Sequence, residues 1–145
     1  MNDLSVDQYV IAVERLTDIE NFDALAQEHW RDFNNREPKF DKSILSLGRA
    51  VVVRHNNVAV GYIVFTVHKN PFYEGEKWCN VGMYYLQKPH RNQGIGADMF
   101  YTLETYAKEQ NCTGIISSFN LKQPLDGFYK KLGFSATHTG LAKEF

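Results

Sequence analysis

Short apolar runs of strand length recur along this chain and are separated by polar turns. The runs lie at residues 9–16, 49–55, 58–68, 78–86 and 113–118, and one more strand is expected to start near Phe134. Asparagine tolerates left-handed backbone, so the pair Asn56-Asn57 predicts a tight turn between the second and third runs. These two runs are therefore expected to form a hairpin.

Apolar residues at three- and four-residue steps predict helices between the strands. The first apolar stripe comprises Ile19, Phe22, Leu25, Ala26, His29, Trp30 and Phe33. Thr17 or Asp18 is expected to cap this helix, and Pro38 breaks it. Further helices are expected at residues 95–110 and 125–132, with one more short helix at 40–47. Gly133 is a suitable C-terminal cap for the helix at 125–132.

The order of these elements predicts the α/β class, as a single domain over residues 1–145 with a central mixed sheet flanked by helices. Residues 78–118 read as strand, helix, strand. Such a unit makes its two strands parallel, with a right-handed crossover. Because 43% of the 145 residues are hydrophobic, the chain can bury a substantial core.

The near-neutral charge limits the partners that are expected. Sixteen Lys and Arg against 17 Asp and Glu leave a net charge of −1, which argues against a nucleic-acid-coating or membrane-surface protein. Cys79 and Cys112 have no paired spacing and read as reduced thiols, and no Cys/His spacing predicts a metal site. Residues 1–10 lack the apolar core of a signal peptide, and no apolar run approaches membrane-spanning length. A cytoplasmic location is therefore expected.

The stretch HRNQGIGADMF, residues 90–100, joins a predicted strand to a predicted helix. A helix N-terminus leaves backbone N–H groups without acceptors and carries partial positive charge. Gly94 and Gly96 would let a ligand approach these groups and Arg91 adds a full charge, so a phosphate or pyrophosphate is the expected guest. A tight turn without a ligand is the alternative. No Lys-Ser/Thr follows Gly96, as a P-loop requires, and Met99 takes the third glycine position of a dinucleotide motif.

Two motifs together resemble the GCN5-related N-acetyltransferases, the GNAT family. RNQGIG, residues 91–96, matches their Q/R-x-x-G-x-G/A signature between the fourth strand and the following helix. FYKKLGF, residues 128–134, resembles their second motif, an aromatic-rich helix ending in Gly-Phe. Residues 124–145 look most like short phage-encoded members. The resemblance implies the GNAT fold, in which the fourth and fifth strands splay apart, and it covers residues 1–45 only loosely.

The resemblance implies acetyl-coenzyme A (acetyl-CoA) as the acetyl donor. Backbone amides from Gln93 to Ala97 would hold its pyrophosphate, and main-chain groups freed by the splayed strands would pair with its pantetheine amides. Lys88, Arg91 and Lys122 are candidates for the remaining phosphate. The implied cofactor-binding residues are Tyr84, Tyr85, Leu86, Arg91, Asn92, Gln93, Gly94, Ile95, Gly96, Ala97 and Lys122.

The chemistry that the resemblance implies is direct attack of a primary amine on the thioester. Tyr129, in the second motif, would give the leaving thiolate a proton, although it also fits a core position. A backbone N–H near Tyr85 would polarise the thioester oxygen. An amine with a pKa of ~10.4 is mostly protonated at neutral pH and needs a base, unless the substrate's own amine has a low pKa. Residues 79–83 carry no acid, so Glu76 in the preceding loop is the first candidate for that base.

Glu74 and His68 are alternative bases, and the acceptor amine would belong to a small molecule, a peptide or a protein. The residues expected to grip it are Trp30, Phe33, Phe72, Tyr73, Glu74 and Glu76, whose acids and aromatic rings suit a cationic amine. Acetylation of a nucleic-acid amine, on tRNA or a base, is a second hypothesis, which the near-neutral charge disfavours. A non-catalytic CoA-binding module that acts through protein contacts is a third. Members of the family are often dimers, so a homodimer is a further expectation.

Overall fold

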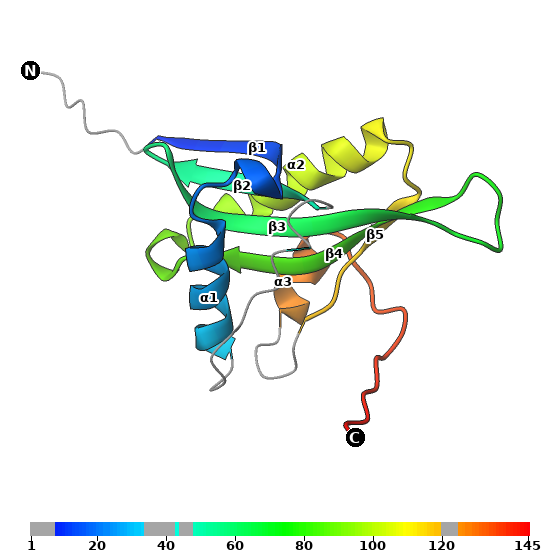
Figure 1. Ribbon diagram of the computed structural model, residues 1–145. Helices are drawn as coiled ribbons and strands as arrows, with labels where there is room; N and C mark the ends of the chain where they lie inside the picture. The colour runs from blue at the N-terminus through cyan, green and yellow to red at the C-terminus, as the bar shows by residue number, and fades with distance from the viewer. Residues whose placement is uncertain (1–7, 34–42, 44–47, 120–124) are drawn as a thin grey trace, which may run out of the picture.

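The computed structural model describes residues 8–33, 43, 48–119 and 125–145. Within these ranges helices and strands alternate along the chain (Figure 1). They are β1 (Tyr9–Arg15), the 3₁₀ turn η1 (Leu16–Asp18), α1 (Phe22–Phe33), β2 (Arg49–His55), β3 (Val58–Lys69), β4 (Lys77–Leu86), the 3₁₀ turn η3 (Lys88–His90), α2 (Ile95–Glu109), β5 (Gly114–Ile116) and α3 (Asp126–Lys131).

The five strands form one sheet in the order β1-β2-β3-β4-β5. Antiparallel pairing joins β1 through β4 in succession, and β5 runs parallel to β4. The β2–β3 hairpin turns at Asn56 and Asn57, whose φ angles of 48° and 71° confirm the left-handed turn that the sequence predicts. The mixed sheet flanked by helices confirms the predicted fold class.

Strand β4 parts from β5 before its own end. Only residues 78–80 of β4 pair with β5, whereas β4 continues to Leu86. The register between β3 and β4 skips Gly82, which forms a bulge in β4 and bends the strand close to the point of separation. Beyond Asn80, the described residues provide no strand partner for the edge of β4 that faces β5. The fourth and fifth strands therefore splay apart as predicted.

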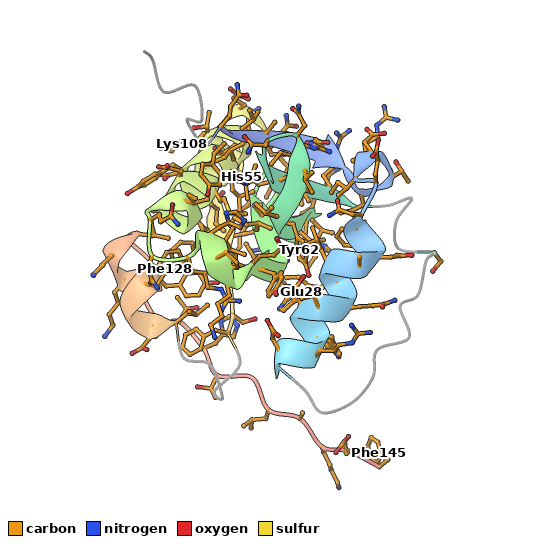
Figure 2. The ribbon with its side chains drawn as sticks, turned by 90° about the vertical axis from the view of Figure 1, so that its left-hand side faces the viewer. Glu28, His55, Tyr62, Lys108, Phe128 and Phe145 are labelled. Carbon is orange, nitrogen blue, oxygen red and sulfur yellow. The ribbon has the colours of Figure 1, made fainter. Side chains whose placement is uncertain are left out.

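Helices cover both faces of the sheet. Strand residues alternate between the faces, so Val51 belongs to the core under α2 and α3, while its neighbour Val52 belongs to the core under α1. Figure 2 shows α1 and α3 on opposite sides of the sheet. The same alternation on β4 turns Tyr84 toward α2 and α3, and Tyr85 toward α1. The splayed end of β4 is thus bordered by a different helix on each face.

The first helix begins later than the sequence predicts. Thr17 and Asp18 lie inside η1 and do not cap α1, which starts at Phe22. Leu16 and Ile19 are both buried, so this turn places two apolar side chains in the core before the helix starts. Burial of two large apolar side chains stabilises the fold by more than one capping hydrogen bond does. The chain therefore forms the 3₁₀ turn here, and the helix starts later.

The predicted strand from Phe134 onward is wrong, because residues 134–145 contain no strand. The Phe134 N–H donates to the Tyr129 carbonyl at 3.0 Å and closes α3, and the following residues run away from the sheet (Figure 1). A strand needs a neighbouring strand to satisfy its backbone groups, and none of the described strands pairs with this segment. The short helix expected at 40–47 lies outside the described residues, apart from Ser43. No helix in the described ranges is long and apolar enough to cross a membrane.

Candidate functional site

The junction between β4 and α2 contains the first N–H groups of a 15-residue helix, with Gln93 and Gly94 exposed and Ile95 and Gly96 buried. The first intrahelical bond runs from the Asp98 N–H to the Gly94 carbonyl at 3.1 Å. The N–H groups of Ile95, Gly96 and Ala97 precede that bond, so the helix itself offers them no acceptor. The helix dipole adds partial positive charge at the same point. The junction therefore has the donors and the field of an anion-binding site.

The two glycines of the junction serve different purposes. Gly94 has a φ of +83° and a Cβ built there would meet nothing within 4 Å, so this position is left-handed and open to solvent. A Cβ on Gly96 would collide with the Tyr84 hydroxyl and would lie 3.4 Å from Phe128. Gly96 is thus required by close packing of β4 and α3 against the helix, while Gly94 leaves room for a ligand.

The residues before Gly94 are held by a small set of polar contacts. The Arg91 Nε donates to the Leu86 carbonyl at 2.7 Å, and Gln93 Nε2 donates to the Pro89 carbonyl at 3.2 Å. Asn92 adopts a left-handed φ of 63° between them. The contact with Leu86 holds the Arg91 guanidinium at the end of β4. Lys88 is exposed in η3, and Lys122 lies outside the described residues.

On the α2 and α3 face, aromatic residues border the splayed strands. Tyr84 and Phe128 stack with ring centroids 5.8 Å apart and planes 7° apart. Tyr129 is only 6% exposed, and the Ser117 hydroxyl donates to its hydroxyl oxygen at 2.8 Å. Burial raises the pKa of Tyr129, and the bond from Ser117 opposes that shift. Tyr129 is therefore a protonated phenol at neutral pH, just beyond the end of β5.

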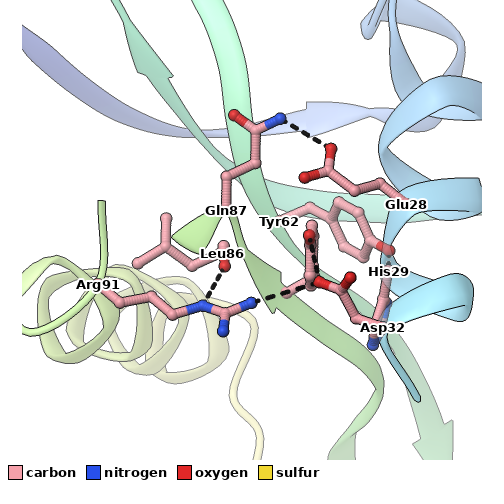
Figure 3. A network of polar contacts seen from close by, with 8 residues as sticks. Glu28, His29, Asp32, Tyr62, Leu86, Gln87 and Arg91 are labelled. Carbon is pink, nitrogen blue, oxygen red and sulfur yellow. Dashed lines mark hydrogen bonds and ion pairs between the residues drawn. The ribbon is translucent and has the colours of Figure 1, made fainter. Parts of the chain in front are cut away.

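On the α1 face, polar side chains cover the far half of β4 (Figure 3). The Tyr85 hydroxyl donates to Asp32 Oδ2 at 2.9 Å, and Gln87 Nε2 donates to Glu28 Oε2 at 2.9 Å. Arg91 reaches the same carboxylate, with its terminal nitrogen 3.8 Å from Asp32 Oδ2 and its guanidinium carbon 5.6 Å from the Tyr85 ring centroid. Arg91 thus connects α1 to the junction, and two carboxylates lie over the unpaired part of β4.

A buried histidine supports this polar group from behind. His29 is 7% exposed, bonds the Tyr62 hydroxyl through Nδ1 at 2.6 Å and stacks on Tyr85 at 4.7 Å. Burial lowers the pKa of His29 to about 4, which the nearby Asp32 partly opposes. The imidazole is therefore neutral at neutral pH. Burial also raises the pKa of Tyr85, with a further contribution from its hydrogen bond to Asp32.

Sequence reasoning named His29 only as part of an apolar stripe and missed Glu28, Asp32 and Gln87. A signal was present, because Glu28 and Asp32 are four residues apart and border His29 on one side of the helix. Two acidic residues beside the apolar stripe of α1 indicate that this side of the helix has a role besides packing against the core. Their proximity to β4 depends on how α1 packs, which the sequence does not display.

The structure does not bring Glu76 to the junction. Glu76 precedes the first residue of β4, whereas the junction follows the last, and a ten-residue strand is ~33 Å long. The Glu76 carboxylate accepts a hydrogen bond from Trp78 Nε1 at 2.7 Å. Phe72 and Tyr73 are exposed in the same β3–β4 loop, and His68 pairs with Trp78 at that end of the sheet. These predicted site residues therefore gather away from α1 and from the start of α2.

Comparison with known proteins identifies the class to which this fold and junction belong. The sequence matches the acetyltransferase (GNAT) family over residues 13–134. The chain therefore belongs to the GNAT family and is an acetyltransferase, and members of this family use acetyl-CoA as co-substrate. Among curated protein sequences no significant match was found.

Solved structures repeat the fold at low sequence identity. Ribosomal-protein-alanine N-acetyltransferase from Brucella melitensis biovar Abortus 2308 superposes with a TM-score of 0.79 at 20% identity, covering 95% of this chain and 99% of that one. Aminoglycoside acetyltransferase meta-AAC0020 from an uncultured soil metagenomic sample gives 0.75 at 15%, covering 94% and 95%. Glucosamine-6-phosphate N-acetyltransferase from Arabidopsis thaliana gives 0.74 at 15%, covering 95% and 99%. These similarities support the fold assignment.

Proposed function

We propose that this acetyltransferase moves the acetyl group of acetyl-CoA directly to a primary amine that lies against α1. One observation carries the proposal: the open N-terminus of α2 stands at the end of β4, whose unpaired edge borders the gap toward β5. An anion site beside a row of unpaired backbone groups suits a molecule with a diphosphate at one end and an amide-containing arm. Acetyl-CoA has this form.

The diphosphate would accept hydrogen bonds from the backbone N–H groups at residues 93–97, with Gly94 leaving room for it. The pantetheine amides would pair with main-chain groups of Tyr84 and Tyr85 on the splayed part of β4. Arg91 is already engaged by Leu86 and Asp32, so we assign it the task of holding the junction in place. Lys88 is exposed beside the junction and remains a candidate for the third phosphate.

In the proposed reaction the amine lone pair adds to the thioester carbonyl carbon and forms the C–N bond, and the C–S bond breaks when the resulting tetrahedral intermediate collapses. The departing thiolate takes the proton of Tyr129, which burial keeps protonated. Because Tyr129 accepts its hydrogen bond from Ser117, its own hydrogen remains for the sulfur. A backbone N–H near Tyr85 would stabilise the oxyanion of the tetrahedral intermediate. The one proton that the nitrogen of the neutral amine loses goes to a carboxylate on α1, and exchange with solvent restores the proton of Tyr129.

Asp32 is the carboxylate to which we assign that proton, in place of Glu76. The Tyr85 hydroxyl holds Asp32 over the splayed half of β4, whereas Glu76 bonds Trp78 at the other end of the strand. Glu28 lies beside it on α1 and would attract a cationic acceptor. The neighbouring folds include enzymes named for a ribosomal-protein alanine, an aminoglycoside and glucosamine 6-phosphate, so an amine is the shared chemistry.

The test has two stages. Isothermal titration of the purified chain with acetyl-CoA measures donor binding, and thiol release is then followed with a panel of an alanine-led peptide, an aminoglycoside, glucosamine 6-phosphate and tRNA. Donor binding with turnover on an amine of the first three kinds is the expected result. Absence of donor binding would refute the donor site, and turnover with tRNA alone would favour the nucleic-acid hypothesis.

A further inference from the structure

Asp32 stands on the exposed end of α1, one residue before the helix ends at Phe33. Its side chain is 45% exposed, and an aspartate in such a place has several rotamers open to it. A group that takes a proton from a substrate must be held within about 0.5 Å of its working position. The Tyr85 hydroxyl, at 2.9 Å from Asp32 Oδ2, is much closer than Arg91 at 3.8 Å. The position of Asp32 therefore depends on the position of Tyr85.

The ring of Tyr85 is held in turn by His29. Tyr85 is 2% exposed, and its ring lies almost parallel to the imidazole, with centroids 4.7 Å apart and planes 14° apart. His29 and Asp32 are three residues apart on α1 and therefore share one side of the helix (Figure 3). The same helix thus contacts Tyr85 twice, at the ring face through His29 and at the hydroxyl through Asp32.

The imidazole itself is fixed by Tyr62 on β3. His29 Nδ1 and the Tyr62 hydroxyl are 2.6 Å apart, and Tyr62 is fully buried, with its ring centroid 5.3 Å from that of Phe22. The Tyr62 ring also lies 6.1 Å from the Tyr85 ring. We call His29, Tyr62 and Tyr85 the ring stack. It joins α1, β3 and β4, so the imidazole cannot turn without breaking a buried hydrogen bond.

Packing alone does not account for the residue types in the ring stack. Apolar side chains at positions 29 and 62 would fill a core without burying any hydrogen-bonding atom, whereas each buried polar atom needs a partner. Here the imidazole and the Tyr62 hydroxyl satisfy one another, and Tyr85 directs its hydroxyl to Asp32. Departures from an apolar core concentrate at functional sites. The ring stack lies in such a place, because Tyr85 belongs to the part of β4 that has separated from β5.

We propose that His29 is a positioning residue for acetyl transfer, which through the Tyr85 ring holds the Asp32 carboxylate where it receives the proton of the amine. The inference rests on the proposed function, since it takes Asp32 as the proton acceptor. His29 touches neither the substrate nor the proton, and it supplies the flat surface against which Tyr85 lies. Among the described residues, Tyr85 and Arg91 both approach Oδ2 of Asp32, which leaves Oδ1 for the amine.

Two double variants that differ only at position 29 test the role of the ring. Both carry Tyr62→Phe, so neither leaves a buried hydroxyl without its imidazole partner. One adds His29→Phe, which keeps a ring against Tyr85, and the space of the removed hydroxyl, 2.6 Å from Nδ1, admits the larger ring. The other adds His29→Leu, which is also apolar but cannot stack. Thermal unfolding of both variants checks that the fold is kept.

Turnover is measured as thiol release from acetyl-CoA with the amine of the panel that reacts. We expect the His29→Leu pair to react roughly tenfold more slowly than the His29→Phe pair at equal CoA affinity, because a 1 Å misplacement costs up to about 10²-fold. Equal turnover of the two pairs would overturn the proposal. Addition of Tyr85→Phe removes the hydroxyl through which His29 acts and should abolish the difference. A difference that persists without that hydroxyl would also overturn it.

Crystal structures of the two double variants give a readout that needs no acceptor amine. The Tyr85 hydroxyl should stay within hydrogen-bonding distance of Asp32 in the His29→Phe pair and leave it in the His29→Leu pair, and an unchanged contact in both would overturn the proposal. If the His29→Leu pair does not fold, Tyr85→Phe alone decides, because wild-type turnover of that variant would overturn the proposal. Wild-type turnover of Asp32→Asn would instead refute the proton assignment of the proposed function, so the two failures are told apart.

Discussion

Replacement of Gly94 gives the sharpest test of the anion site. Its φ of +83° disfavours any residue with a Cβ by roughly 1–2 kcal/mol, and less for asparagine and aspartate. A Cβ there meets no neighbour within 4 Å, so a substitution adds no collision to that cost. Gly94→Asn and Gly94→Asp have nearly the same shape and backbone preference and differ by one charge. Comparison of the two variants therefore isolates electrostatics at the junction.

The expected difference follows from Coulomb's law. A diphosphate carries about two negative charges, and a carboxylate about 6 Å away in a water-like dielectric repels it by ~1.4 kcal/mol. That energy is a tenfold loss of affinity, and any exclusion of water increases it. We therefore expect Gly94→Asp to bind CoA at least about tenfold more weakly than Gly94→Asn, with the two melting temperatures within a few degrees of one another.

Isothermal titration with CoA and thermal unfolding are the two measurements. Gly75→Asn and Gly75→Asp are the matched controls, because Gly75 has a φ of +81°, has nothing within 4 Å of its Cβ and lies in the β3–β4 loop. This second pair should show equal CoA affinity. Equal affinity of the Gly94 pair as well would refute the claim that the start of α2 holds the diphosphate. Raising the salt concentration should shrink the difference in the Gly94 pair.

Three further predictions concern Tyr129, Gly96 and the buried His29. Tyr129→Phe should lower turnover by roughly 10²-fold, which is about what general-acid catalysis contributes, and should leave the affinity for CoA unchanged. An unaffected turnover rate would show that Tyr129 is not the proton donor. Gly96→Ala should destabilise the fold by about 1–3 kcal/mol in chemical denaturation, because the added methyl group meets the Tyr84 hydroxyl. Addition of Tyr84→Phe removes that hydroxyl and should restore part of the lost stability. A double variant that is no more stable than Gly96→Ala would contradict the packing argument. Burial lowers the pKa of His29 from 6.5 to about 4, so the unfolded chain takes up the proton at a higher pH than the folded chain does. The free energy of unfolding should therefore fall by up to about 3 kcal/mol as the pH drops from 6.5 to 4. A His29→Gln variant whose free energy of unfolding falls equally steeply would count against this assignment.

Local sequence signals determined the strands, the hairpin and the junction. Strand β2 occupies residues 49–55 as predicted, because its apolar run is continuous and is followed by two asparagines that adopt left-handed backbone. The start of α2 at Ile95 follows Gly94, whose positive φ is one that glycine adopts without a steric cost. The glycine motif at residues 91–96 and the aromatic motif at residues 128–134 together indicated the family. Each of these features depends on residues that are neighbours in the chain.

Tertiary packing decided the parts of the site that join distant segments. Gly96 is a glycine because Tyr84 and Phe128 reach it from β4 and α3, a contact that no local pattern shows. Asp32 acquires a place beside β4 through Tyr85, which is 53 residues away. The strand expected after Phe134 did not form: a strand's backbone groups are satisfied only by a neighbouring strand, and the folded chain pairs none of its described strands with residues 134–145. Periodicity reports which side of an element is apolar, but only the folded chain determines what lies opposite that side.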